Sequence, residues 1–149
     1  MKIKDLLKEG IGSFHTLRQE ENVMQAIKKM SAYSVSALVV RTKTELHGIF
    51  TERDLIRCHI LFPEKAIQEI SVKDVMTSQL IVAEPGDTIE EAMGIMIQAK
   101  IRHLPVVSDG RITGLICLED LAGKHVGALT RELHYLKDYI SDLQDAAHD

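Results

Sequence analysis

The sequence predicts an α+β fold: two β-α-β-β-α copies that pack as a pseudo-two-fold pair, followed by a C-terminal helix. Three observations lead to this prediction. Residue types recur at a spacing of 66 positions, as between Gly48 and Gly114. Each copy carries a helical apolar stripe followed by two short β-rich runs. The tail carries apolar residues at alternating spacings of four and three.

The repeat covers most of the chain and is the first feature to establish, because it fixes the fold. Identical pairs at this spacing include Ala26 and Ala92, Met30 and Met96, Gly48 and Gly114, and Asp54 and Asp120. Residues of similar type also match between them, such as Val23 with Ile89. The chain is therefore a tandem duplication.

Each copy contains the same order of predicted elements. Apolar residues at i, i+3, i+4 and i+7 predict an amphipathic helix over 23–30 and again over 89–96. Two strands follow, at 37–40 and 48–50 in the first copy and at 104–107 and 114–116 in the second. Ser108-Asp109-Gly110-Arg111 predicts a hairpin turn, and Pro105 predicts an edge strand. A helix is expected to open at Asp54 and at Asp120.

The two copies are expected to fold together. One copy has only about 60 residues, a size at which a single hydrophobic core is marginal. Packing the two sheets against each other removes this difficulty and places equivalent clefts between the halves. The predicted domains are 1–66 and 67–126, with a linker at 62–65 and a C-terminal helix at 127–149.

The tail permits two interpretations. Its apolar residues form a narrow seam typical of a coiled coil. The helix either packs back on its own domain or serves in self-association. Gly123 and Gly127 weaken any continuous helix leading into it. The seam consists of Leu129, Leu133, Leu136, Ile140 and Leu143.

Composition excludes several classes of function. The net charge of −4, without a basic cluster, argues against nucleic-acid binding. No apolar run reaches the ~20 residues that span a membrane, and the first residues lack the pattern of a signal peptide. The only cysteines, Cys58 and Cys117, have no CxxC spacing, so the cytoplasm is the expected compartment.

Both copies contain ordered motifs. The first copy contains Ala37-Leu38-Val39-Val40 and Gly48-Ile49-Phe50-Thr51-Glu52-Arg53-Asp54. The second contains Val72-Lys73-Asp74-Val75-Met76-Thr77 and Arg102-His103-Leu104-Pro105-Val106. In these motifs the chain resembles stand-alone tandem cystathionine-β-synthase (CBS) domain pairs, also called Bateman modules, and the tail from Glu132 to Ile140 is similar to the terminal helix of this group. Two ordered copies in register make the resemblance specific.

The resemblance implies a regulatory, non-catalytic module that binds AMP, ADP, ATP or a related adenosyl ligand. In such modules a Thr/Ser-x-x-Asp motif binds the ribose and an Arg-His pair of the opposite domain faces the phosphates. Carried over to this chain, one cleft uses Ile49, Thr51, Asp54, Leu80, Ile81, Arg102 and His103. A homodimer, formed through apolar helix surfaces, and an unidentified regulated protein are further implied.

The second cleft departs from the family pattern. Cys117 replaces the Thr/Ser while Asp120 remains, and Ser36 and Ala37 stand where the Arg-His pair is expected. This cleft, with Phe14, His15, Cys117 and Asp120, is expected to bind a phosphorylated ligand more weakly.

Simpler interpretations compete with these assignments. Thr51 and Asp54 also match a capping box, and Arg102, His103 and Arg53 could be plain surface residues. The sequence lacks the spacings of a zinc site and of a nucleophile paired with a base, so neither a metal nor catalysis is expected. A scaffold with vestigial clefts is the alternative to a sensor, and a nucleotide-processing enzyme is a third hypothesis.

Overall fold

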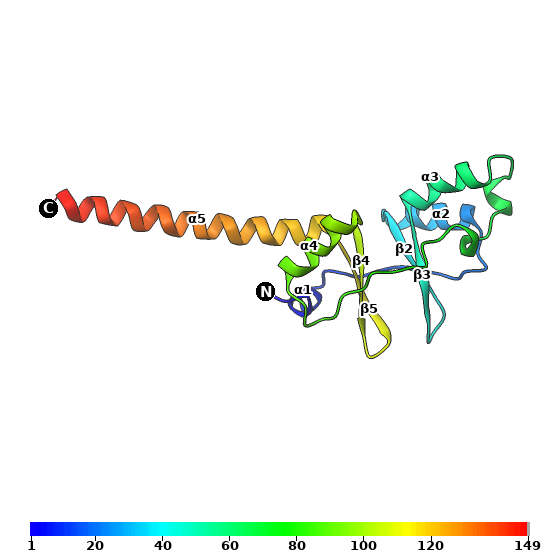
Figure 1. Cartoon of the computed structure of the whole chain (residues 1–149), viewed down its shortest axis with the longest axis horizontal. Coiled ribbons are helices and arrows are strands. Elements are labelled where there is room, and N and C mark those ends of the chain that lie inside the picture. The colour runs from blue at the N-terminus through cyan, green and yellow to red at the C-terminus, as the bar shows by residue number, and fades with distance from the viewer. Residues whose placement is uncertain (149) are drawn as a thin grey trace.

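The computed structural model describes residues 1–148, without the side chains of 128–132, 135, 139 and 145–148. Two α+β halves lie side by side, and a long helix extends from the second half (Figure 1). The two sheets face each other in the middle of the molecule, and the helices cover their outer faces. This is the predicted architecture.

The first half contains strands β1 (Thr16–Leu17), β2 (Ala37–Arg41) and β3 (Leu46–Thr51), in the order β1-β2-β3. β1 is parallel to β2, and β2 is antiparallel to β3. Helix α2 (Val23–Tyr33) begins at a capping box between Asn22 and Gln25, and helix α3 (Glu52–Leu61) follows β3 directly. Helix α3 ends at Leu61, and Phe62 is its C-cap.

The second half repeats this plan with a shorter first strand. Ala83 forms a single parallel bridge to Val106 in place of β1. Helix α4 (Ile89–Ala99), strand β4 (His103–Ser108) and strand β5 (Arg111–Cys117) follow. Asp109 and Gly110 join β4 to β5 with φ of 52° and 75°, the two left-handed residues of the predicted hairpin turn. β4 and β5 form a two-stranded sheet, and on its other side β4 meets, among the described residues, only the Ala83 bridge, in which the Pro105 carbonyl accepts from Ala83 at 2.8 Å.

The halves exchange their leading segments. Helix α1 (Ile3–Lys8) places Ile3 and Leu6, both fully buried, in the core of the second half. The two 3-10 turns η1 (Ile67–Glu69) and η2 (Val72–Asp74) pack against the core of the first half. Burial of a large aliphatic side chain contributes about 1.5–3 kcal/mol, so each half depends on residues from beyond its own repeat.

A third core cluster joins the two halves. It contains apolar residues of both sheets, with Phe14, Leu46 and Leu80 packed around it. The buried members are Ala37, Val39, Ile49, Ile112 and Leu115. The predicted pairing of the sheets is therefore present.

Helix α5 corrects one prediction. It runs without a break from Leu118 to His148, so the helix of the second repeat and the tail are one element. Gly123 and Gly127 do not interrupt it. Each glycine lowers helix stability by about 1 kcal/mol, but the good helix formers on both sides maintain cooperative propagation. Among the described residues, no atom outside the adjacent turns of the helix would lie within 4 Å of a Cβ at either glycine, so packing does not require them.

Candidate functional site

A cavity of about 520 Å³ opens between the two halves. Its walls come from both sheets and from the segment that connects the halves. Cavities of this size accommodate a small organic ligand. The lining residues are Ser36, Ile49, Thr51, Glu52, Arg53, Ile56, Thr77, Gln79, Leu80, Ile81, Ile101, Arg102, His103 and Pro105.

The turn from β3 into α3 supplies one wall. Thr51 is the N-cap of α3: its hydroxyl accepts from the Asp54 backbone N–H at 3.4 Å, and its own N–H donates to the Asp54 carboxylate at 2.9 Å. The capping interpretation of this motif is therefore correct. Because an N-cap residue has extended backbone, the turn brings Thr51 and Arg53 to the rim of the cavity.

The connecting segment supplies the opposite wall. Thr77 pairs with Ile49 through two backbone hydrogen bonds of 2.9 Å, which continue the sheet toward Leu80 and Ile81. Gly48 is required here, since a Cβ at this position would lie 2.5 Å from the Thr77 carbonyl oxygen.

The beginning of β4 supplies a polar wall. His103 and Ser36, from opposite halves, are joined by a hydrogen bond of 2.8 Å between the imidazole Nε2 and the hydroxyl. Burial lowers the pKa of His103, which favours the neutral ring. Arg102 forms an ion pair with Glu119 at the beginning of α5, and this hydrogen bond raises the pKa of Arg102 and lowers that of Glu119.

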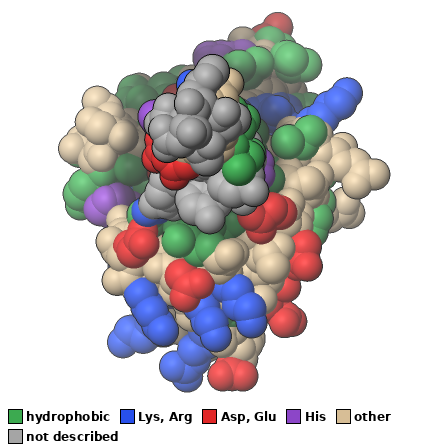
Figure 2. Space-filling model, turned by 90° about the vertical axis from the view of Figure 1, so that its left-hand side faces the viewer, with side chains coloured by type: hydrophobic (Ala, Val, Ile, Leu, Met, Phe, Trp, Pro, Cys, Tyr) green, Lys and Arg blue, Asp and Glu red, His purple; other side chains and the backbone are tan. Residues whose placement is uncertain are grey.

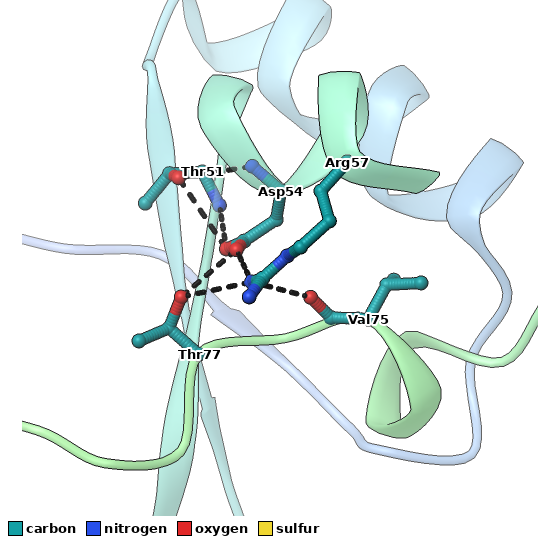
Figure 3. Close-up of polar contacts among 5 residues, drawn as sticks. All are labelled: Thr51, Asp54, Arg57, Val75 and Thr77. Atoms are coloured by element: carbon teal, nitrogen blue, oxygen red, sulfur yellow. Dashed lines mark hydrogen bonds and ion pairs between the residues drawn. The ribbon is translucent and has the colours of Figure 1, made fainter. Parts of the chain in front are cut away.

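Asp54 differs from its predicted state. Its carboxylate is 1% exposed and does not line the cavity. It accepts from Thr51 and from the Thr77 hydroxyl at 2.8 Å, and it forms an ion pair with Arg57 (Figure 3). Arg57 also donates to the Val75 carbonyl at 3.1 Å. The Asp54 carboxylate, expected to be available to a ribose, is therefore already paired, because Arg57 and Thr77 reach it from positions that the repeat does not indicate.

The predicted first-cleft residues are otherwise brought together. The other six line the cavity, and Asp54 lies behind Thr51 and Thr77. Sequence reasoning did not assign the other eight lining residues to this cleft, among them Ser36, Thr77 and Gln79. Thr77 ends the Val72–Thr77 string that carries the family resemblance, so it could have been assigned. Gln79 carries no comparable signal. The six residues in the cavity wall are Ile49, Thr51, Leu80, Ile81, Arg102 and His103.

The residues assigned to the second cleft each have a described partner. The ring of His15 stacks on that of Tyr33 at 3.7 Å, and Arg41 lies over the ring of Phe14 at 5.2 Å. The Cys117 thiol donates to the Asp120 carboxylate at 3.0 Å. Burial, followed by this hydrogen bond, raises the Cys117 pKa to about 11, so the thiol remains protonated at neutral pH.

Comparison with known proteins decides the family. The model of the CBS domain matches residues 3–60 and again 72–132. The chain belongs to the CBS-domain family. The mitochondrial CBS domain-containing protein CBSX3 of Arabidopsis thaliana is 33% identical over 138 residues, which cover 89% of this chain and 66% of CBSX3. The chain spans between 21% and 66% of the length of the first curated relatives that it matches.

Solved structures of CBS proteins share this fold. The CBS domain NE2398 superimposes with a TM-score of 0.79 at 32% identity, over 85% of this chain and 98% of that one. CBSX2, solved in complex with AMP, superimposes with a TM-score of 0.69 at 20% identity, over 85% and 97% of the two chains. This second likeness concerns the CBS fold alone.

Two further observations concern other functions. Within residues 1–148, no helix is long and apolar enough to cross a membrane. Among the side chains that the structure describes, no three or more of histidine, cysteine, aspartate or glutamate are grouped so that they could hold a metal ion.

Proposed function

We propose that this CBS pair is a non-catalytic regulatory module that binds an adenine nucleotide in the cavity and thereby regulates a partner protein. The observation that carries the proposal is the composition of the cavity wall. Apolar side chains, including Ile49, Leu80 and Ile81, lie in the same cavity as Arg53 and Arg102. A nucleotide joins a flat base, which packs against apolar side chains, to an anionic phosphate, which pairs with arginine.

Each part of a nucleotide has a proposed partner. Leu80 and Ile81 contact the base, with the backbone of their segment available for its hydrogen-bonding edge. Thr51 and Asp54 bind the ribose, and Arg102 with His103 faces the phosphate. A guanidinium is suited to phosphate because it donates two parallel hydrogen bonds. The proposal requires Arg102 to exchange Glu119 for phosphate. Both side chains of this pair are more than half exposed, at 64% and 56%, so the exchange is inexpensive.

The ribose requires a second exchange. Asp54 is buried, so the ribose hydroxyls must replace the Thr77 hydroxyl and the Arg57 guanidinium on its carboxylate. Arg57 is 46% exposed, and water can solvate it when it leaves. The complex of CBSX2, which shares the fold, with AMP is consistent with this class of ligand. The preference among AMP, ADP and ATP depends on the residues of this chain that line the cavity.

A homodimer and a cytoplasmic location complete the proposal. Helices α3 and α4 expose large apolar side chains that suit association of two CBS pairs: Ile56, Ile60, Ile95 and Ile97 are 42–74% exposed. Both cysteines are free, as expected in a reducing compartment. Light scattering at micromolar protein tests the dimer, and a mass that remains monomeric at all concentrations contradicts it.

Isothermal titration calorimetry with AMP, ADP and ATP tests the nucleotide. We expect one tight site per chain, because the Asp120 cleft lacks the hydroxyl and the Arg-His pair. Two equal sites would contradict the residue assignment. No binding, with no nucleotide found by mass spectrometry after native purification, would favour a constitutive scaffold. Hydrolysis of ATP above background would favour an enzyme.

A further inference from the structure

The outer part of α5 presents an apolar seam to solvent. The helix contacts the body through its first turns, where Leu121 is buried and Lys124 forms an ion pair with Glu9 at 2.6 Å. Beyond them the helix extends away from both halves (Figure 1). Leu133, Leu136, Ile140 and Leu143 are each 52–54% exposed. The predicted alternative in which this helix packs back on its own domain is therefore wrong; Leu129 of the seam lies outside the described side chains.

The seam has an uninterrupted seven-residue repeat. Successive members are separated by four and three residues in strict alternation from Ala122 to Leu143. A helix that covers a globular core carries a broader stripe, whereas a strict spacing of 3.5 residues is the mark of a supercoiled pair. Val126, Leu133 and Ile140 occupy the a positions, and Ala122, Leu129, Leu136 and Leu143 occupy the d positions.

We propose that α5 pairs with α5 of a second copy as a parallel, two-stranded coiled coil that extends from the CBS body. Two of the three a residues are β-branched and three of the four d residues are leucine, the combination that favours parallel dimers. The register also places Glu132 at g and Lys137 at the following e. In a parallel pair these two positions face each other across the two helices, and the charges of the two residues are opposite.

Other occupants fit the seam less well. In an antiparallel pair, e faces e and g faces g, so the match between Glu132 and Lys137 is lost. A membrane-surface helix has a wide apolar face and a basic polar face. Here the apolar face is a narrow seam, and residues 137–145 contain three aspartates and one lysine. Figure 2 views the molecule from the side on which α5 ends. It shows both basic and acidic side chains on the body below the helix, so the charges on this face are mixed in sign.

Single cysteines in the full chain test the pairing and its direction. Leu143→Cys places a thiol in the seam near the end of the helix, and Ser141→Cys places one on the outer face two residues away. Under mild oxidation we expect most of Leu143→Cys, at least tenfold more than of Ser141→Cys, to form a covalent dimer on a non-reducing gel. The wild type measures the background from Cys58, which is buried, and Cys117, which is partly buried.

A second pair of variants tests the apolar contact itself. Ile140→Asp in the Leu143→Cys background should abolish the cross-link, while Ser141→Asp, which adds the same charge to the outer face, should leave it intact. Equal cross-linking of Leu143→Cys and Ser141→Cys, or none in either, would overturn the proposal. So would a covalent dimer that forms only when Val126→Cys and Leu143→Cys are mixed, since that result indicates antiparallel pairing. The experiment contains no nucleotide, so its failure is independent of the proposed function.

Discussion

The turns that follow β3 and β5 are two copies of one segment, yet their carboxylates lie in opposite surroundings. Asp54 is 1% exposed, whereas Asp120 lies at the surface. Asp54 has the hydroxyl and backbone of Thr51, the Thr77 hydroxyl and the Arg57 guanidinium as partners. The described side-chain hydrogen bond to Asp120 is the one from Cys117.

Each partner of Asp54 is replaced in the second copy by a residue of another type. Cys117 corresponds to Thr51, and Gly123 stands 66 positions after Arg57. The backbone carbonyl of Gly12 accepts from Leu115 as that of Thr77 accepts from Ile49, both at 2.9 Å, so Gly12 replaces Thr77. A buried carboxylate must be hydrogen-bonded or paired. The comparison therefore shows that the carboxylate of this motif is buried in the copy where an arginine and a second threonine are its partners.

The largest effect is expected from replacing the two aspartates separately. Asp54→Ala should weaken nucleotide binding about 30- to 100-fold, because charge-assisted hydrogen bonds are worth roughly 1.5–3 kcal/mol each. It should also lower the free energy of unfolding by about 2–3 kcal/mol, since Thr51, Arg57 and Thr77 lose an acceptor. This corresponds to a fall of about 4–12 °C in Tm. Calorimetric titration and thermal unfolding measure the two effects.

Asp120→Ala is the matched control and should change neither quantity much, with a stability loss within about 0.5 kcal/mol for an exposed site. Equal effects of the two substitutions would remove the proposed difference between the clefts. Unchanged nucleotide affinity in Asp54→Ala would mean that the Asp54 carboxylate serves only in the cap of α3.

A smaller effect of opposite sign is expected at Arg57. Its guanidinium occupies the carboxylate oxygen that the ribose must reach, so Arg57→Ala should bind nucleotide about 3- to 10-fold more tightly. The same change should lower stability by about 1 kcal/mol, a value reduced by the partial exposure of the side chain. Titration calorimetry measures the affinity, with Arg111→Ala as a control at an exposed arginine outside the cavity wall. Weaker binding by Arg57→Ala would mean that the guanidinium contacts the ligand.

The smallest effect concerns pH. Burial holds the pKa of His103 below its usual value of about 6.5. The unfolded chain therefore binds more protons in the window below about 6.5, and the contribution of His103 to stability is lost as pH falls through that window. Glu119 and Glu52 oppose the shift, and Arg102 adds to it. Thermal unfolding at pH 5.5 and 7.5 should show a smaller difference for His103→Asn than for wild type; an equal difference would assign the pH dependence elsewhere.

Sequence patterns predicted the parts of this molecule that local chemistry determines. The stripes of α2 and α4, the Asp109-Gly110 turn and the duplication each follow from spacing or from backbone preference. Six of the fourteen lining residues followed from the family resemblance. Two features escaped because they depend on residues far apart: the contact of Thr77 with Asp54 spans 23 positions, and α1 packs in the core of the other half. The continuation of α5 through two glycines escaped because helix propensity is only a weak guide to a helix boundary.

The ion pair between Arg102 and Glu119 joins the cavity wall to the first turn of α5. Because α5 is one helix of 31 residues, it forms a rod of about 46 Å at 1.5 Å per residue. Because the helix is attached to the body at one end, a small rotation at its base moves its free end much further. A rotation of about 10° at its base would displace its tip by about 8 Å, as follows from that length. The proposed exchange, in which Arg102 leaves Glu119 for a phosphate, occurs at the base of this helix. An adjustment of ångström size beside the cavity would therefore become a larger displacement at the free end of α5, which another molecule can detect.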